Sequence, residues 1–376
     1  GGGGAASMTL GEVQTATARR WERVWISLMA VLLALLVGAI VILWAGRNPL
    51  LAYYALWNAS FGSWRGFGEA LVSITPLIFT GLSVAFAFRT GLFNIGAEGQ
   101  LIMGQMGAAV AGYALTGLPA IIHVPLALII GALVGAIWAG IPGFLKARLG
   151  AHEVINTIMM NYIALYFTHY LVVGPLKGHS YLPVTKQVLD SAKLWRFIPP
   201  TRANIGFFVA LLMAAVIYFI LWRTTLGYEC RAVGLNADAA EYAGINVSRN
   251  LVFSMMISGA LAGMGGAVQV LGVQHRFYDL FGFTGYGFDG IAVALLGNNH
   301  PLGVIAGASL FGILARGSQN MQSMAQVPKE VIGIVQAAVV LFITADYLMR
   351  KLLHWRQRAG RQTADAMGKS VGRDGK

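Results

Sequence analysis

The chain has 376 residues, of which 57% are hydrophobic and only 11% are charged, and its mean hydropathy is +0.66. Soluble domains average about 25% charged residues, so these figures exclude a soluble domain, a disordered chain and a collagen-like fibre, and they indicate an integral membrane protein with several spans. The net charge of +12 does not predict nucleic-acid binding, because the basic residues are scattered over connecting segments and the C-terminal tail, where anionic lipid attracts them.

The positions of the apolar runs predict ten membrane spans, since a helix needs about 20 mainly apolar residues to cross the hydrocarbon core. The eighth and ninth runs are short and are separated by "GNNHPLG", so they are either two short spans or one broken hairpin. The ten runs lie near residues 24–45, 69–88, 96–116, 119–142, 155–174, 204–222, 250–272, 287–298, 302–316 and 329–349.

An even number of spans places both chain ends on one side of the membrane. With both ends inside, seventeen Lys and Arg residues fall inside and ten outside, and eight of the seventeen follow the last span. The positive-inside rule therefore supports this orientation mainly through the tail. The expected division is a cloning remnant at 1–7, a cytoplasmic segment at 8–23, a permease domain at 24–349 and a basic cytoplasmic tail at 350–376.

The segment 223–249 is polar and helix-prone although two strongly apolar runs flank it. Asn236 can cap a short helix "ADAAEYA" by accepting hydrogen bonds from its first turn. Asp238 lies in that turn, where the helix dipole favours an acid, and Gly244 is a typical C-terminal stop. The segment is either an ordinary connector or a docking helix for a soluble partner.

Four blocks of the sequence together resemble a known family. "RAVGLNADAAEYAGINVSR" resembles the cytoplasmic loop of permease subunits in ATP-binding-cassette importers of the branched-chain amino acid, ribose and simple-sugar class. "GLFNIGAEGQLIMGQ", "HEVINTIMMNYIALY" and "GYGFDGIAVALLG" are similar to its nucleoside and simple-sugar branch. The resemblance runs from about residue 65 to 345, and it implies a type II-like, all-α permease fold.

The resemblance also implies partners. They are a cytoplasmic ABC ATPase, a second permease subunit (a paralogue or a copy), a substrate-binding lipoprotein and membrane lipid, with no nucleic acid. The coupling residues that it implies face the ATPase: Asn236, Asp238, Ala239, Glu241, Tyr242 and Gly244. No G-x-x-x-x-G-K-[ST] phosphate loop is present in the sequence, so this chain is expected to be no enzyme and to bind no cofactor, with ATP and Mg on the partner ATPase.

The stretch "FNIGAEGQ" places polar side chains between two apolar runs. Phe93, Asn94, Glu98 and Gln100 are therefore candidates for the substrate pathway, because a carboxylate at membrane depth is costly and points to function. The alternative interpretation is a short cytoplasmic turn in which Glu98 is wet or paired with Arg89.

Asn161 is a further pathway candidate within the fifth run. Its simpler role is a hydrogen bond to a neighbouring helix, a common use of Asn in membranes. His152 and Glu153 begin like a zinc motif, but Asn156 stands where the second His belongs, so a metal site is rejected.

"GYGFDG" matches the dinucleotide fingerprint by its letters alone. No strand precedes Gly285, Gly287 and Gly290, so the fingerprint is rejected. Asp289 is either a helix N-terminal charge or a residue at the outer mouth of the pathway, and Gln336 in the last run is a similar candidate.

Three G-x-x-x-G pairs predict close contact between helices: Gly131/Gly135, Gly259/Gly263 and Gly303/Gly307. The Gly-rich turns in "FRTGLFNIGAEGQLIMGQMGAA" and "FTGYGFDGIAVALLGNNHPLG" resemble each other weakly and are five spans apart. They suggest an inverted five-span repeat, an arrangement that often encloses a central site.

The sequence as a whole predicts the permease of an ATP-driven nucleoside importer in the bacterial cytoplasmic membrane. Two alternatives stay open. Within the same family, the solute is a simple sugar, riboflavin or another small polar molecule. In a different class, the chain is a gradient-driven secondary transporter in which Glu98 carries the coupling ion.

Overall fold

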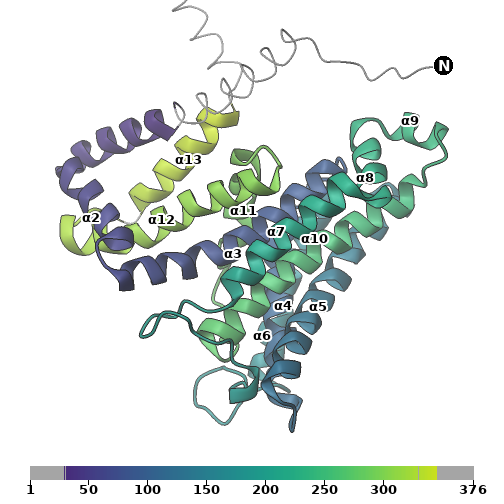
Figure 1. Ribbon diagram of the computed structural model, residues 1–376, viewed down its shortest axis with the longest axis horizontal. Helices are drawn as coiled ribbons and strands as arrows, with labels where there is room; N and C mark the ends of the chain where they lie inside the picture. Colours follow the sequence, from purple (N-terminus) through teal and green to yellow (C-terminus); the bar gives the residue numbers. More distant parts are fainter. Residues whose placement is uncertain (1–28, 30, 329, 345–376) are drawn as a thin grey trace, which may run out of the picture. The chain divides into compact units, whose positions relative to one another are not determined.

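The computed structural model describes residue 29, residues 31–328 and residues 330–344 (Figure 1). The described residues are nearly all helical, and the extended backbone among them amounts to two isolated bridges, Val184 with Tyr278 and Arg196 with Asn204. The predicted all-α fold is confirmed. The predicted segments 1–7, 8–23 and 350–376, and the ends of the first and last predicted spans, lie outside the described residues.

The contacts separate the chain into two compact units, one of which is Leu50–Lys329 and the other of which joins Gly1–Pro49 to Glu330–Lys376. The second unit contains the apolar helix Val31–Trp44 and α13 (Glu330–Thr344). The larger unit contains α2 (Pro49–Phe61), α3 (Trp64–Arg89), α4 (Ala97–Ala114), α5 (Ala120–Leu149), α6 (Glu153–Val173), α7 (Gly206–Arg223), α8 (Thr225–Leu235), α9 (Ala237–Tyr242), α10 (Val247–Gln269, extended by a π-turn to Gln274), α11 (Tyr286–Leu296) and α12 (Pro301–Ala325).

Five described helices are long and apolar enough to cross a membrane: α3, α5, α7, α10 with its π-turn, and α12. The predicted third and fifth spans are α4 and α6, which are less apolar. The eighth is α11, only 11 residues long, whereas the ninth, α12, has 25 residues and continues past the predicted end at 316. The two form a hairpin with one short arm. Sequence reasoning also missed α2.

The core of the larger unit is α3, whose side chains are buried along nearly the whole helix. Glycines bring α4, α5 and α10 into contact with one another. A Cβ on Gly104 would meet the backbone of Gly263, and a Cβ on Gly135 would meet Gly259. The prediction that Gly131/Gly135 and Gly259/Gly263 form helix contact surfaces is therefore confirmed, and the structure shows that the two pairs face each other. The Gly303/Gly307 pair in α12 packs in the same way against the end of α11, where it meets Gly297 and Val293.

One end of the larger unit carries α8 and α9, and we call it the α9 end (Figure 1). Helices α3, α5, α7 and α11 finish there, and α10 and α12 begin there. Arg89 reaches the 298–299 turn, Ser248 donates to the Ala147 carbonyl, and Gly234 of α8 packs on Gly91.

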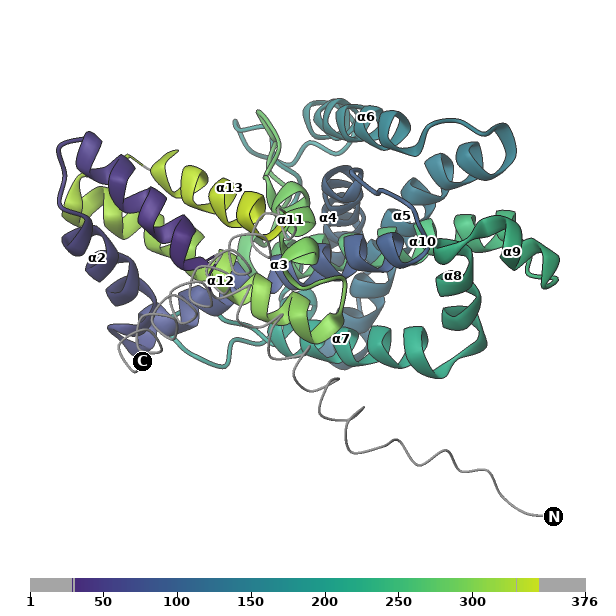
Figure 2. The same cartoon turned by 90° about the horizontal axis from the view of Figure 1, so that it is seen from above.

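At the opposite end the 174–205 loop covers the finish of α4 and α10, where Leu189 bonds Gly112 and Leu194 bonds Leu271. The connections of this unit therefore alternate between the two ends as the predicted topology requires. Figure 2 shows α6 at the edge, beside α4 and α5.

Candidate functional site

The polar side chains between α3 and α4 are buried and bonded to one another. Asn94 donates through Nδ2 to Ser258 (2.8 Å) and to Gln100 Oε1 (2.9 Å), and its Oδ1 accepts from the Gly96 amide (2.9 Å). Asn94 and Gln100 are each 1% exposed. These two predicted pathway residues therefore hold the break between the helices together in this structure.

Asn161 on α6 caps the first turn of α4. Its Oδ1 accepts from the Gly99 amide (2.8 Å), and its Nδ2 donates to the Ile95 carbonyl (3.0 Å). The simpler role foreseen for Asn161, a hydrogen bond to a neighbouring helix, is what the structure shows.

Glu98 is fully buried, and its carboxylate lies at the N-terminus of α11. One oxygen accepts from the Thr284 hydroxyl (2.6 Å) and the Gly285 amide (2.9 Å), and the other accepts from the Gly287 amide (2.6 Å). Both alternative interpretations of Glu98, a wet side chain and a pair with Arg89, are wrong. Gly285 has no side chain to cap α11, so α4 supplies the cap.

Helices α4 and α11 begin side by side and leave in opposite directions. Glu98 ties their first turns together, and α4 then runs to the loop end while α11 runs to the α9 end. This is the local geometry that an inverted pair of Gly-rich turns requires. The full five-span repeat stays a prediction.

Two of the predicted pathway residues are partly exposed in the larger unit. Phe93 packs edge-on against Phe88 at 4.9 Å. Asp289 lies in the first turn of α11 beside the exposed Phe288. Gln336 lies on α13 in the smaller unit and is half-buried.

Three aromatic rings that sequence reasoning did not single out contact one another near the start of α11. Phe283 contacts Phe288 at 5.6 Å and Tyr162 of α6 at 5.1 Å between ring centroids. Tyr162 is 45% exposed and Phe288 is 38% exposed. We call Tyr162, Phe283 and Phe288 the aromatic cluster. Tyr162 precedes Phe283 and Phe288 by 121 or more residues, so the local sequence pattern gave no signal for the aromatic cluster.

The segment 223–249 forms α8 and α9. Asn236 Oδ1 accepts from the Ala239 amide (3.0 Å), and Gly244 ends the helix with φ +82°. The predicted capped helix and its stop are confirmed. Ala240 packs inward, and the residues predicted to face the ATPase are all exposed: Asn236, Asp238, Ala239, Glu241, Tyr242 and Gly244.

Helix α8 is fastened to the transmembrane bundle. Asn250 of α10 donates to Glu229 (2.9 Å) and lies beside the buried thiol of Cys230. Gly234 packs so closely on the main chain of Arg89 and Gly91 that a Cβ would not fit. The exposed α9 is thus mounted on a helix that touches both α3 and α10.

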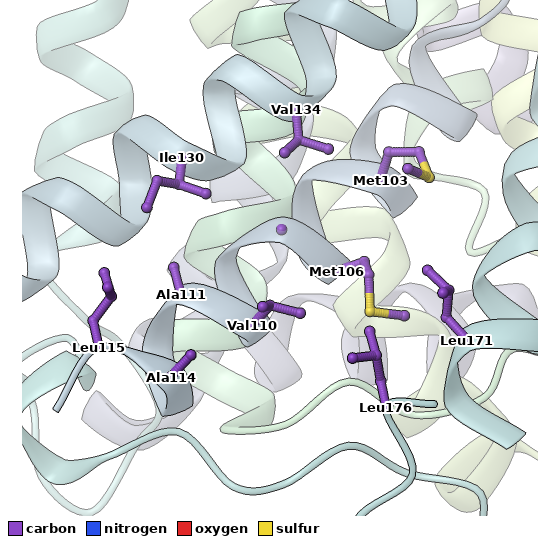
Figure 3. A pocket seen from close by; sticks show the side chains of 11 residues that line it. Met103, Met106, Val110, Ala111, Ala114, Leu115, Ile130, Val134, Leu171 and Leu176 are labelled. Carbon is purple, nitrogen blue, oxygen red and sulfur yellow. The ribbon is translucent and has the colours of Figure 1, made fainter. Parts of the chain in front are cut away.

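A cavity of about 410 Å³ lies between α4, α5 and α6, away from the polar groups (Figure 3). Its lining is apolar throughout and includes Met103, Met106, Val134 and Leu171. A polar solute would find no hydrogen-bond partner there, so this cavity is not a candidate for the transport pathway.

An apolar helical bundle with a buried polar break and an exposed helix pair at one end defines a multi-pass membrane protein of the permease class. Residues 66–344 match the family described as "Branched-chain amino acid transport system / permease component". The chain belongs to this family.

Relatives cover nearly the whole chain. It is 45% identical to the guanosine ABC transporter permease protein NupP of Bacillus subtilis over 91% of this chain and 99% of the relative. It is 38% identical to the nucleoside ABC transporter permease protein NupB of Lactococcus lactis (88% and 93%) and 33% identical to the glucose ABC transporter permease protein TsgB13 of Haloferax volcanii (93% and 96%). No solved structure matches the chain.

Proposed function

We propose that this chain is the permease subunit of an ATP-driven nucleoside importer in a bacterial cytoplasmic membrane. The observation that carries the proposal is the helix pair α8–α9, which is capped, anchored and exposed along its predicted docking face. The relatives named for guanosine and nucleosides, at 45% and 38% identity, support the choice of solute.

In this proposal the α9 end is cytoplasmic and a partner ATPase supplies the energy. ATP and Mg²⁺ bind the partner, and this chain is a non-catalytic subunit that works beside a second permease. ATP can shift the permease between states only because the docked ATPase contacts α9 differently in each.

The docking role is tested by Asp238→Arg, which reverses a charge on exposed α9. We expect the ATPase to co-purify weakly and nucleoside uptake to fall by about tenfold or more, since reversing a charge in an interface costs over a kcal/mol. Tyr181→Arg, an exposed position on the opposite end, is the control for ATPase co-purification. Full uptake with normal ATPase stimulation in Asp238→Arg would contradict the docking role.

The proposed point of solute contact is the aromatic cluster with Asp289. A nucleoside has a flat base that stacks on aromatic rings and a ribose diol that donates hydrogen bonds to a carboxylate. Phe288 and Tyr162 are partly exposed, and Asp289 adjoins Phe288 in the first turn of α11. Phe93, Asn94, Glu98, Gln100, Asn161 and Gln336 stay predictions as pathway residues.

This contact is tested by Asp289→Asn and Phe288→Ala in vesicles that contain the whole importer. We expect the KM for nucleoside uptake to rise by about tenfold, equivalent to about 1.4 kcal/mol. Tyr170→Ala removes an exposed ring on the same helix as Tyr162 and serves as the control. Unchanged KM values in both variants would exclude the aromatic cluster.

The delivery of solute is assigned to a substrate-binding lipoprotein at the opposite end of the larger unit. Exposed Lys177, Lys186 and Arg196 lie on the 174–205 loop together with the exposed rings of Tyr181 and Trp195. Basic and aromatic residues suit a protein interface that is steered by charge. The lipoprotein should therefore bind more weakly as salt concentration rises.

The alternative solutes and the alternative mechanism are separated by one uptake assay. Excess glucose or riboflavin should leave labelled guanosine uptake unchanged if the importer carries nucleosides. Uptake should also stop without ATP. Accumulation by this chain alone, driven by an ion gradient, would support the secondary transporter instead.

A further inference from the structure

Helix α11 is short, and it begins within the bundle beside the first turn of α4 and finishes at the α9 end. Its 11 residues span about 16 Å at 1.5 Å per residue, roughly half of a bilayer's hydrocarbon core. It runs parallel to the second half of α3, where the Thr80 hydroxyl donates to the Tyr286 carbonyl (2.9 Å). A Cβ atom added to Gly81 of α3 would lie 3.4 Å from the Cβ atom of Val293 on α11.

The N-terminal end of α11 is held by Glu98. Both carboxylate oxygens accept hydrogen bonds there, from Thr284, Gly285 and Gly287. Negative charge at a helix N-terminus is favourable. Gly287 also leaves no room for a Cβ against the Glu98 main chain, so the first turns of α11 and α4 are in direct contact.

The C-terminal end of α11 is held by Arg89, the last residue of α3. Its Nε donates to the Asn299 carbonyl (3.0 Å) and its Nη2 to the Asn298 carbonyl (3.2 Å). Both asparagines have left-handed backbones, with φ 53° and 52°, so the turn after α11 presents its carbonyls to the cation. The guanidinium also lies 5.5 Å from the Trp222 ring centroid on α7.

Arg89 is also the point at which α8 touches α3. The Gly234 position of α8 packs on the main-chain carbonyl of Arg89 and on Gly91. A displacement of α8 and α9 therefore presses on the backbone whose side chain holds the end of α11.

We propose that Arg89 and Glu98 are positioning residues that hold α11 at its two ends, and that Arg89 transmits displacement of the α8–α9 pair to α11, which moves against α3 during transport. This inference rests on the proposed function of α9 as the ATPase contact. In this proposal α11 takes one arrangement against α3 in each transport state and so couples the two sites.

The first test uses the importer assembled with its ATPase and second permease. Arg89→Ala should lower solute transported per ATP hydrolysed by about tenfold, which corresponds to about 1.4 kcal/mol. Arg89→Lys, which keeps one cationic donor, should recover part of the loss. Arg148→Ala removes an exposed arginine from the last turn of α5 and should have no effect. An unchanged ratio in Arg89→Ala would overturn the inference.

The second test locks α11 in place. The double variant Gly81→Cys/Val293→Cys brings two Cβ atoms close to disulfide distance, and it is made with Val304→Ala because the Cβ at position 81 would otherwise lie 2.8 Å from Val304 Cγ1. Oxidation should stop transport and reduction should restore it in the same preparation. Transport that continues in the oxidised protein would show that α11 does not move against α3 and would overturn the inference.

A third measurement separates this inference from the identity of the solute. The disulfide of the double variant should form more slowly when the partner ATPase is trapped with vanadate, because α11 has then left its place on α3. No solute is needed for this measurement. Failure of nucleoside uptake with a vanadate-dependent rate would contradict only the proposed function, whereas equal rates would contradict the role of α11.

Discussion

The residues that matter most in the larger unit are polar side chains with fully matched partners. Asn94 and Gln100 bond each other, and Asn161 accepts from the Gly99 amide in the first turn of α4. A buried polar group that loses its partner costs about 1–3 kcal/mol. The polar break between α3 and α4 is therefore stable because its hydrogen bonds are complete.

Glu98→Gln tests this at a single side chain. Glu98 accepts hydrogen bonds from the amide N–H groups of Gly285 and Gly287. In the Gln variant the side-chain NH₂ group is a donor, so it would face one of these N–H groups without an acceptor between them. We expect roughly 2 kcal/mol of lost stability, measured as a lower midpoint of thermal unfolding in detergent. Glu241→Gln, on exposed α9, should leave the midpoint unchanged. Equal midpoints in both variants would contradict the capping role.

Sequence reasoning found Glu98 but not its partners. The local pattern marked a costly carboxylate in an apolar region, whereas Gly285 lies 187 residues away. Arg89 was seen only as a partner for Glu98, because nothing local reveals that the 298–299 turn will present two carbonyls to it. Contacts of this kind depend on how the helices assemble.

At the scale of helices, contact between glycines sets the spacing of α4, α5 and α10. Gly104 faces Gly263, and Gly135 faces Gly259, with no space for any side chain. Small residues allow such close approach in membranes, where packing rather than the hydrophobic effect joins helices. The G-x-x-x-G spacing in the sequence predicted that these glycines form helix contact surfaces, but only the structure shows that those of α5 meet those of α10.

Gly104→Val should separate α4 from α10. The added side chain meets the Gly263 backbone, which cannot move aside as a side chain can. We expect a large loss of folded protein, measured by size-exclusion chromatography of a fluorescent fusion. Gly282→Val, at a position with open space around it, should behave like the unchanged protein. A normal yield from Gly104→Val would show that the two helices are not in contact.

Helices could be predicted where local chemistry decides them. Asn236 and Gly244 marked both ends of α9 correctly, because a cap and a left-handed stop are properties of a few adjacent residues. The length of α12 was underestimated, since its second half carries polar residues that a hydropathy criterion rejects yet a packed helix tolerates. Helix α2 was missed because 13 residues are too few for a span.

At the scale of the whole molecule, the count of basic residues supports the predicted orientation in the membrane mainly through the C-terminal tail. Cys230 is the single cysteine and is buried. Burial raises the pKa of its thiol, so at pH 7 it holds less thiolate, the reactive form, than a free cysteine. Its labelling by maleimide should be slow at pH 7 and should accelerate as pH rises.

Because maleimide labels Cys230 slowly, a cysteine introduced at an exposed position reports which side of the membrane it faces. Ala239→Cys, on α9, should react quickly in inside-out vesicles and not in intact cells. Tyr181→Cys, on the opposite end, should show the reverse pattern. Rapid reaction of Ala239→Cys in intact cells would reverse the orientation and contradict a cytoplasmic ATPase contact.

The length of α11 also bears on how the protein is made. A helix of 11 residues is too short to enter a bilayer as an independent span. The backbone N–H groups of its first turn also have no hydrogen-bond acceptor within their own segment. The carboxylate that satisfies them was synthesised nearly 190 residues earlier. Integration of this region must therefore follow the assembly of α3 and α4, so biogenesis of the second half depends on the first half having already folded.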